Sequence, residues 1–168
     1  MLYRQFYLNT STPVLLHLYK TQIRPHLEYA SVVWDAYLAK DIQLLEGVQK
    51  FAAKVISNNW DMEYLEMLYM LDLPELAIRR KISQLTFLFK IVNQLTFYPE
   101  APLTPRTLHY PTRTVHSAPY HQLHVRTYQY LYSFFPHAIS LWNNLPSNTV
   151  ILSNVHNFNE AMYEYFCT

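Results

Sequence analysis

Apolar side chains recur every three or four residues through the N-terminal third of the chain, which is the spacing of one helix face turned toward a core. Tyr19 and Ile23 belong to the first such stripe. Pro25 interrupts it, because its ring clashes with the carbonyl one turn earlier and it has no N–H to donate. The pattern therefore predicts one helix over residues 13–24 and a second over 25–37, joined by a kink or restart near the proline.

Further helices are predicted downstream by the same spacing and by helix-start residues. In the first of them, Val48, Ala52 and Ile56 are expected to face the core. The next long helix starts at a proline, which is well tolerated in a first turn because its missing N–H has no helical partner there. The helices are expected at residues 40–57, at 62–70 with Asp61 as the cap, from Pro74 through Val92, from Pro136 to a stop at Pro146, and from a cap at Ser153 to Phe166.

A proline-rich stretch separates the long helix from the C-terminal helices. Between residues 96 and 123, prolines at positions 99, 102, 105, 111 and 119 leave little room for regular structure, and we expect a loop or an extended arm. Farther on, Tyr128, Tyr130 and Tyr132 alternate with other residues. This period of two favours a short strand or hairpin edge over residues 125–135.

Length and composition suit a single core of moderate size, since 51% of the 168 residues are apolar. The predicted fold class is mainly α, a helical bundle of about six helices with a proline-rich extended arm and room for one short strand or hairpin. We expect a helical bundle over residues 1–95, the arm over 96–132 and a C-terminal helical tail over 133–168 that packs on the bundle. Together these parts would form one compact domain.

Residue types that occur once exclude several kinds of site. Gly47 is the only glycine, so neither a dinucleotide-binding fingerprint nor a phosphate-binding loop can be formed. Cys167 is the only cysteine, which excludes an internal disulfide framework and a Cys-rich zinc knuckle. The N-terminal apolar run is too short for a membrane span and no small-residue cleavage site follows it. We therefore expect a soluble protein without a membrane partner, in the nucleus or the cytoplasm.

Acidic residues and histidines do not form a recognisable catalytic set. The aspartates are Asp35, Asp41, Asp61 and Asp72. No two are adjacent, so the paired aspartates that hold two Mg²⁺ ions in polymerases are missing. Four histidines crowd the arm, namely His109, His116, His121 and His124. No cysteine or nearby carboxylate completes a tetrahedral zinc site with the last two, and no serine lies in a glycine-flanked elbow. We expect no enzymatic activity from this chain alone, and no cofactor or metal site.

Three blocks of sequence follow one another in a distinctive order. The first is IRPHLEYASVVWD, followed closely by DIQLLEGVQKFAAKVI. The second is LDLPELAIRRKISQLTFLFKIVN at residues 71–93, and the third is SFFPHAISLWNNLPSNTV at residues 133–150. Together they resemble the region downstream of the catalytic palm in reverse transcriptases of non-LTR (LINE-type, jockey-like) retrotransposons. The likeness spans most of residues 15–166.

The resemblance implies that the chain is the thumb and tail of such an RNA-directed DNA polymerase, without the palm that holds the catalytic aspartates and their Mg²⁺. Its inherited role would be to contact an RNA or DNA template-primer, or to pack against the missing palm. Cations on a helix surface bind phosphates without reading sequence. The candidate contacts are Lys20, Arg24, His26, Lys50, Lys54, Arg79, Arg80 and Lys81.

The net charge of +1 gives no electrostatic case for a free-standing nucleic-acid binder, so any basic surface must be local. Two other interpretations therefore stay open. A helical protein-interaction module would bind its partner without sensitivity to salt. An inactive transposon remnant would expose apolar surface where a palm once docked.

Overall fold

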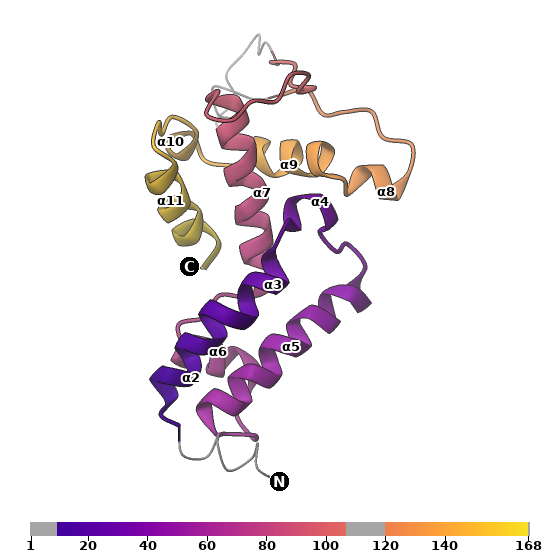
Figure 1. Cartoon of the computed structure of the whole chain (residues 1–168). Coiled ribbons are helices and arrows are strands. Elements are labelled where there is room, and N and C mark those ends of the chain that lie inside the picture. Colours follow the sequence, from indigo (N-terminus) through magenta and orange to yellow (C-terminus); the bar gives the residue numbers. More distant parts are fainter. Residues whose placement is uncertain (1–9, 107–119, 168) are drawn as a thin grey trace. The chain divides into compact units, whose positions relative to one another are not determined.

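The computed structural model describes residues 10–106 and 120–167, and these residues are mainly helical (Figure 1). The predicted fold class is confirmed: six helices have seven or more residues, and the described residues contain an isolated β-bridge, Pro105 with Tyr120, and no sheet. None of the described helices combines the length and the apolar character needed to cross a membrane. The elements are α2 (Thr12–Leu18), the π-helix η1 (Tyr19–Ile23), α3 (Arg24–Glu28), α4 (Ser31–Trp34), α5 (Ala39–Ser57), α6 (Tyr64–Met70), α7 (Leu76–Val92), α8 (Tyr128–Leu131), α9 (Phe134–Asn143), α10 (Ser147–Val150) and α11 (Val155–Cys167).

The described residues form two compact units. The N-terminal unit contains residues 10–30 and 36–79, and the C-terminal unit contains residues 31–35 and 80–167. The division falls within α7, after Arg79, whereas the parts predicted from the sequence were divided at residues 95 and 132. The first turn of α7 therefore belongs to one unit and the rest of the helix to the other.

Pro25 changes the type of helix rather than ending it. α2 continues into η1, where the N–H of Arg24 bonds to the carbonyl of Tyr19, five residues earlier, and α3 follows directly. Pro25 has no N–H to donate, so the regular α-helical hydrogen bonds cannot continue through it, and the π-helical turn lies directly before this break. The helix predicted over residues 25–37 is wrong in extent, because Ala30 adopts a φ of 52° between two short helices, α3 and α4.

The core of the N-terminal unit lies where α5 contacts α2 and α6. α5 ends at Asn58, which has a φ of 50°, the left-handed conformation common after a helix. The buried side chains of this core are Leu15, Tyr19, Ala53, Ile56, Met67, Leu68, Leu71 and Leu73. Ile56 faces the core as predicted, but Val48 is 43% exposed and its neighbour Gln49 is buried instead.

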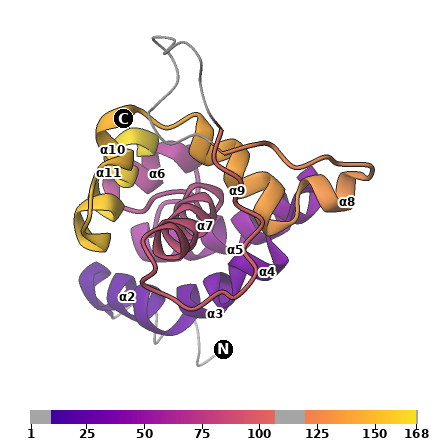
Figure 2. The same ribbon diagram turned by 90° about the horizontal axis from the view of Figure 1, so that it is seen from above.

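The C-terminal unit is built around aromatic side chains. Figures 1 and 2 show α9 and α11 on different sides of the C-terminal part of α7. Phe89 of α7 stacks on Phe158 of α11, with ring centroids 4.3 Å apart, and Trp142 of α9 stacks on the same Phe158 at 6.0 Å. All three are fully buried. Offset stacks of this kind stabilise a core beyond the area they bury.

The strand predicted over residues 125–135 is wrong. Tyr128–Leu131 is the short helix α8, and the side chain of Thr127 caps it by accepting a hydrogen bond from the N–H of Tyr130 at 3.3 Å. Alternating tyrosines favour a strand only where another strand can pair with them. The described residues offer none, so the local cap determines the structure.

Two predicted helix caps, Asp61 and Ser153, are also wrong. α6 has Glu63 at its N-cap position and no side-chain cap; the side chain of Asn59 accepts hydrogen bonds from the N–H groups of Asp61 and Met62, both at 3.1 Å, in the turn before the helix. Before α11, Asn154 rather than Ser153 accepts one from the N–H of His156 at 2.7 Å. Asparagine is among the best cap residues because its carbonyl oxygen reaches these donors easily.

Candidate nucleic-acid interface

Three of the eight predicted contact residues lie in internal ion pairs. The guanidinium of Arg79 forms a two-pronged pair with Glu28, through Nε and through Nη2 at 3.0 Å. Nε of Arg24 lies 3.8 Å from the same carboxylate. Arg80 is 1% exposed and pairs with Asp35 at 2.7 Å. Arg79 and Arg80 connect segments that are distant in the sequence, Arg24 pairs within α3, and the guanidinium of Arg80 does not reach the surface.

The Arg80–Asp35 pair continues as a chain of hydrogen bonds through the C-terminal unit. The second carboxylate oxygen of Asp35 accepts from the amide of Gln84 at 2.9 Å, and the carbonyl of that amide lies 2.8 Å from Nδ1 of His137. Burial lowers the pKa of His137 below its usual 6.5; the Asp35 carboxylate opposes this change and the Lys81 ammonium adds to it. The chain thus links the segment before α5 to α7 and α9.

A second network of hydrogen bonds lies inside the N-terminal unit, around the fully buried Gln49. Its side-chain carbonyl accepts from the hydroxyl of Tyr19 at 2.7 Å. Its amide nitrogen donates to the carbonyl of Pro74 at 3.0 Å and to the hydroxyl of Tyr64 at 3.3 Å. Burial raises the pKa of both tyrosines, so these hydroxyls stay protonated and can donate.

Glu46 extends this network to the start of α7. One carboxylate oxygen accepts from the hydroxyl of Tyr64 at 2.7 Å, and the other accepts from the backbone N–H of Ala77 at 2.8 Å. A carboxylate is favourable at this place because the first N–H groups of a helix lack helical partners and carry positive partial charge. Glu46 therefore acts as a cap supplied by another helix.

The remaining predicted contacts stay closer to solvent. His26 and Lys50 are exposed, and Lys20, Lys54 and Lys81 are half-buried. Within residues 10–106 and 120–167, none of these five takes part in an ion pair. Lys81 belongs to the C-terminal unit and the other four belong to the N-terminal unit. The ammonium groups of the four lysines and the imidazole ring of His26 are therefore available to a ligand.

Lys50 and Lys54 lie one turn apart on α5, each beside an aromatic ring. The ammonium of Lys54 is 5.7 Å from the ring centroid of Trp60 and donates a hydrogen bond to the carbonyl of that residue at 3.1 Å. The ammonium of Lys50 is 5.9 Å from the ring centroid of Tyr64. Phe51 meets Trp60 edge to face at 6.1 Å. We call these five residues the α5 patch.

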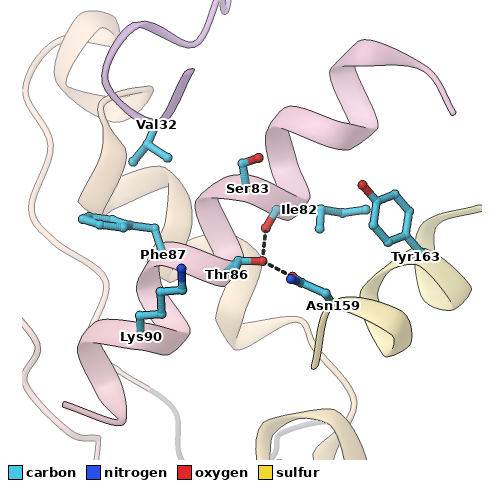
Figure 3. A pocket seen from close by; sticks show the side chains of 8 residues that line it. All are labelled: Val32, Ile82, Ser83, Thr86, Phe87, Lys90, Asn159 and Tyr163. Atoms are coloured by element: carbon cyan, nitrogen blue, oxygen red, sulfur yellow. Dashed lines mark hydrogen bonds between the residues drawn. The ribbon is translucent and has the colours of Figure 1, made fainter. Parts of the chain in front are cut away.

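A pocket of about 270 Å³ lies in the C-terminal unit between α7 and α11 (Figure 3). Its lining residues are Val32, Ile82, Ser83, Thr86, Phe87, Lys90, Asn159 and Tyr163. The hydroxyl of Thr86 donates to the carbonyl of Ile82 at 2.8 Å and is hydrogen-bonded to Asn159. Among the lining residues Lys90 carries the only charge. The pocket could hold one small anionic group, but it is smaller than most ligand sites.

The predicted absence of a metal site stays a prediction. In the part of the chain that the structure describes, no three His, Cys, Asp or Glu side chains come together as metal ligands would. His121 and His124 are exposed. His109 and His116 lie outside the described residues.

Sequence reasoning missed three residues that the structure brings into prominence. Gln49, which is buried, and His137, which is half-buried, are polar residues whose hydrogen bonds cannot be foreseen from the periodic spacing of apolar residues around them. Trp60 follows the asparagines at the end of α5, and its 54% exposure cannot be read from its type. The one available signal was the pair of lysines a turn apart shortly before it.

The chain was compared with protein-family models, with curated proteins and with solved structures, and none of them matches it.

Proposed function

We propose that this chain is the C-terminal thumb and tail of a LINE-type reverse transcriptase, and that it holds the template-primer duplex by contacts to phosphate. The chain would not be an enzyme on its own. Two Mg²⁺ ions and their aspartates would belong to the palm of the parent polymerase. The proposal starts from the three sequence blocks that resemble this family and from the mainly helical fold.

The positions of the charged residues in those blocks support the proposal. Glu28 of the first block pairs with Arg79 of the second, and Asp35 pairs with Arg80. Because residues of the first block pair with residues of the second inside the fold, each block needs the other, which explains why both occur in one sequence. This assigns the charged residues of these pairs to the scaffold and leaves ligand contact to other cations.

The observation that carries the proposal is the pair of lysines on α5. Lys50 and Lys54 lie one turn apart, beside aromatic rings and without an acidic partner among the described residues. Two cations at this spacing on one helix face can contact phosphates of a duplex without reading its sequence. Lys20 and His26, in the same unit, are the other candidates.

The test is a salt titration of duplex binding. A blunt RNA–DNA hybrid carrying a fluorophore is titrated with the chain, and the slope of log affinity against log salt is measured. Each phosphate contact contributes about 0.9 to this slope for duplex DNA, so the double variant Lys50→Gln, Lys54→Gln should flatten it by about 2. Lys40→Gln, an exposed lysine near the start of the same helix, is the matched control and should leave the slope unchanged. A slope of zero for the unaltered chain would remove phosphate contact as its function.

A second candidate function, a protein-interaction module, is favoured by an apolar groove of about 400 Å³ in the C-terminal unit. The groove has no charged lining residue. Its walls include Val33, Phe87, Tyr98, Phe134 and Phe135, and the first of these is 86% exposed. Burial of this surface by a partner would depend on the hydrophobic effect and would persist at high salt. The same salt titration therefore separates the two functions.

A further inference from the structure

Two aromatic side chains of the α5 patch have no role in the fold that would explain their place. Phe51 is 62% exposed and Trp60 is 54% exposed, and neither belongs to the buried core of the N-terminal unit. They contact each other edge to face, so each ring still presents aromatic surface to solvent. Large rings left in water lose the stabilisation that burial would give them.

The charges beside these rings indicate what could cover them. Lys54 lies against the ring of Trp60, and Lys50 lies one turn earlier on the same face of α5. An uncharged apolar partner would leave both ammonium groups without a counter-charge. A nucleotide offers a flat π-face for a ring and a phosphate for a lysine, which is the pairing that proteins use to bind single strands.

We propose that the α5 patch binds unpaired nucleotides of a single strand, with a base stacked on Trp60 or Phe51 and the adjoining phosphates held by Lys54 and Lys50. The inference rests on the proposed function, and it adds a distinct ligand to it. Phosphate contacts along a duplex need the lysines alone. Stacking needs the rings and requires bases that are not paired, as in a template strand beyond its duplex.

The local charges limit the strength of this binding. Asp61 follows Trp60 directly and Glu63 lies two residues farther on, and both are exposed. Their carboxylates repel phosphate, so affinity should be modest and strongly dependent on salt. For the same reason, Asp61→Asn should bind a single strand more tightly than the unaltered chain.

The experiment compares two labelled probes by fluorescence anisotropy at low salt. One is an oligothymidylate of about ten nucleotides, and the other is a blunt duplex. Loss of one base stack weakens single-strand binding by about fivefold or more, so Trp60→Ala and Phe51→Ala should each show a loss of this size on the oligothymidylate. Neither change should alter binding to the blunt duplex. Trp60→Phe should keep most of the affinity, because it keeps a ring to stack on.

Tyr69→Ala is the matched control, because Tyr69 is a 92% exposed aromatic residue of the same unit that lies outside the patch. It should bind both probes as the unaltered chain does. If Trp60→Ala binds the oligothymidylate normally, or if the chain binds only the duplex, the inference is overturned and the proposed function stands. If the chain binds neither probe, both are overturned. Circular dichroism of each variant checks that the helices remain.

Discussion

The two units of this protein bury polar side chains in different ways. The N-terminal unit buries a neutral group, the amide of Gln49, which is hydrogen-bonded to Tyr19, Tyr64 and the carbonyl of Pro74. The C-terminal unit buries a charge, the guanidinium of Arg80, against the carboxylate of Asp35. Both arrangements connect segments that are distant in the sequence.

The difference determines what happens when one partner is removed. A neutral group that loses its partner remains in the core as an unsatisfied donor or acceptor. A buried charge that loses its counter-charge is much less stable there, because the low dielectric of the interior no longer offers compensation. We therefore expect the C-terminal network to be the more sensitive of the two.

The largest effect is expected from Asp35→Ala, which leaves the Arg80 guanidinium buried without its carboxylate. Loss of one partner from a buried ion pair costs about 3–5 kcal/mol, and the free energy of unfolding should fall by that amount. Urea denaturation followed by circular dichroism measures it. Asp61→Ala removes an exposed aspartate and is the matched control, with an expected change within about 0.5 kcal/mol.

Replacing both charges sharpens this test. The double variant Asp35→Leu, Arg80→Met should be markedly more stable than Asp35→Ala, because it leaves no buried charge. Equal instability of the two variants would show that the pair is needed for its shape and hydrogen bonds rather than to compensate a charge.

An intermediate effect is expected from Gln49→Leu in the N-terminal network. The change leaves the buried hydroxyl of Tyr19 without its acceptor, and an unsatisfied buried group of this kind costs about 1–3 kcal/mol. Chemical denaturation is again the measurement, with Gln43→Leu at an exposed position of α5 as the control. Adding Tyr19→Phe to Gln49→Leu should restore part of the loss, since it removes the orphaned hydroxyl. A loss larger than that of Asp35→Ala would reverse the comparison.

The smallest effect is a dependence of stability on pH that comes from His137. Its pKa in the folded chain is lowered from 6.5 by burial, so the unfolded chain binds a proton first as the pH falls. Stability should therefore be complete above pH 6.5 and decline below it, until the folded-state pKa is reached. Denaturation midpoints measured between about pH 7 and pH 5 test this. His137→Gln should reduce the decline, whereas His121→Gln, at an exposed position, should not.

The helical content of the chain follows from its sequence, but the polar contacts between helices do not. The spacing of apolar residues that predicts the helices indicates which helix face is apolar. The structure has α5, α7, α9 and α11 close to the predicted ranges. That spacing carries no information about the partner of a polar side chain. For this reason Gln49 and His137 were missed, and Arg79 and Arg80 were predicted at a ligand surface although they pair with Glu28 and Asp35.

Errors in the predicted elements arose where a local hydrogen bond outweighed the periodic spacing of side chains on which the prediction was based. The tyrosines of residues 125–135 alternate like a strand, but the cap from Thr127 and the lack of a pairing strand among the described residues give the helix α8. Similarly, Asn154 rather than the predicted Ser153 caps α11, and Asn59 bonds to the turn before α6, which begins three residues after the predicted cap Asp61. A choice between neighbouring cap residues depends on local backbone geometry, which the sequence alone does not supply.

The proposed contact with phosphate is tested most directly by titrating the unaltered chain against a blunt RNA–DNA hybrid at several salt concentrations. If Lys20, Lys50 and Lys54 each neutralise one phosphate, affinity should fall about fortyfold between about 50 and 200 mM salt. An affinity that does not change over this range would contradict the account, because no surface whose cations contact phosphates binds independently of salt.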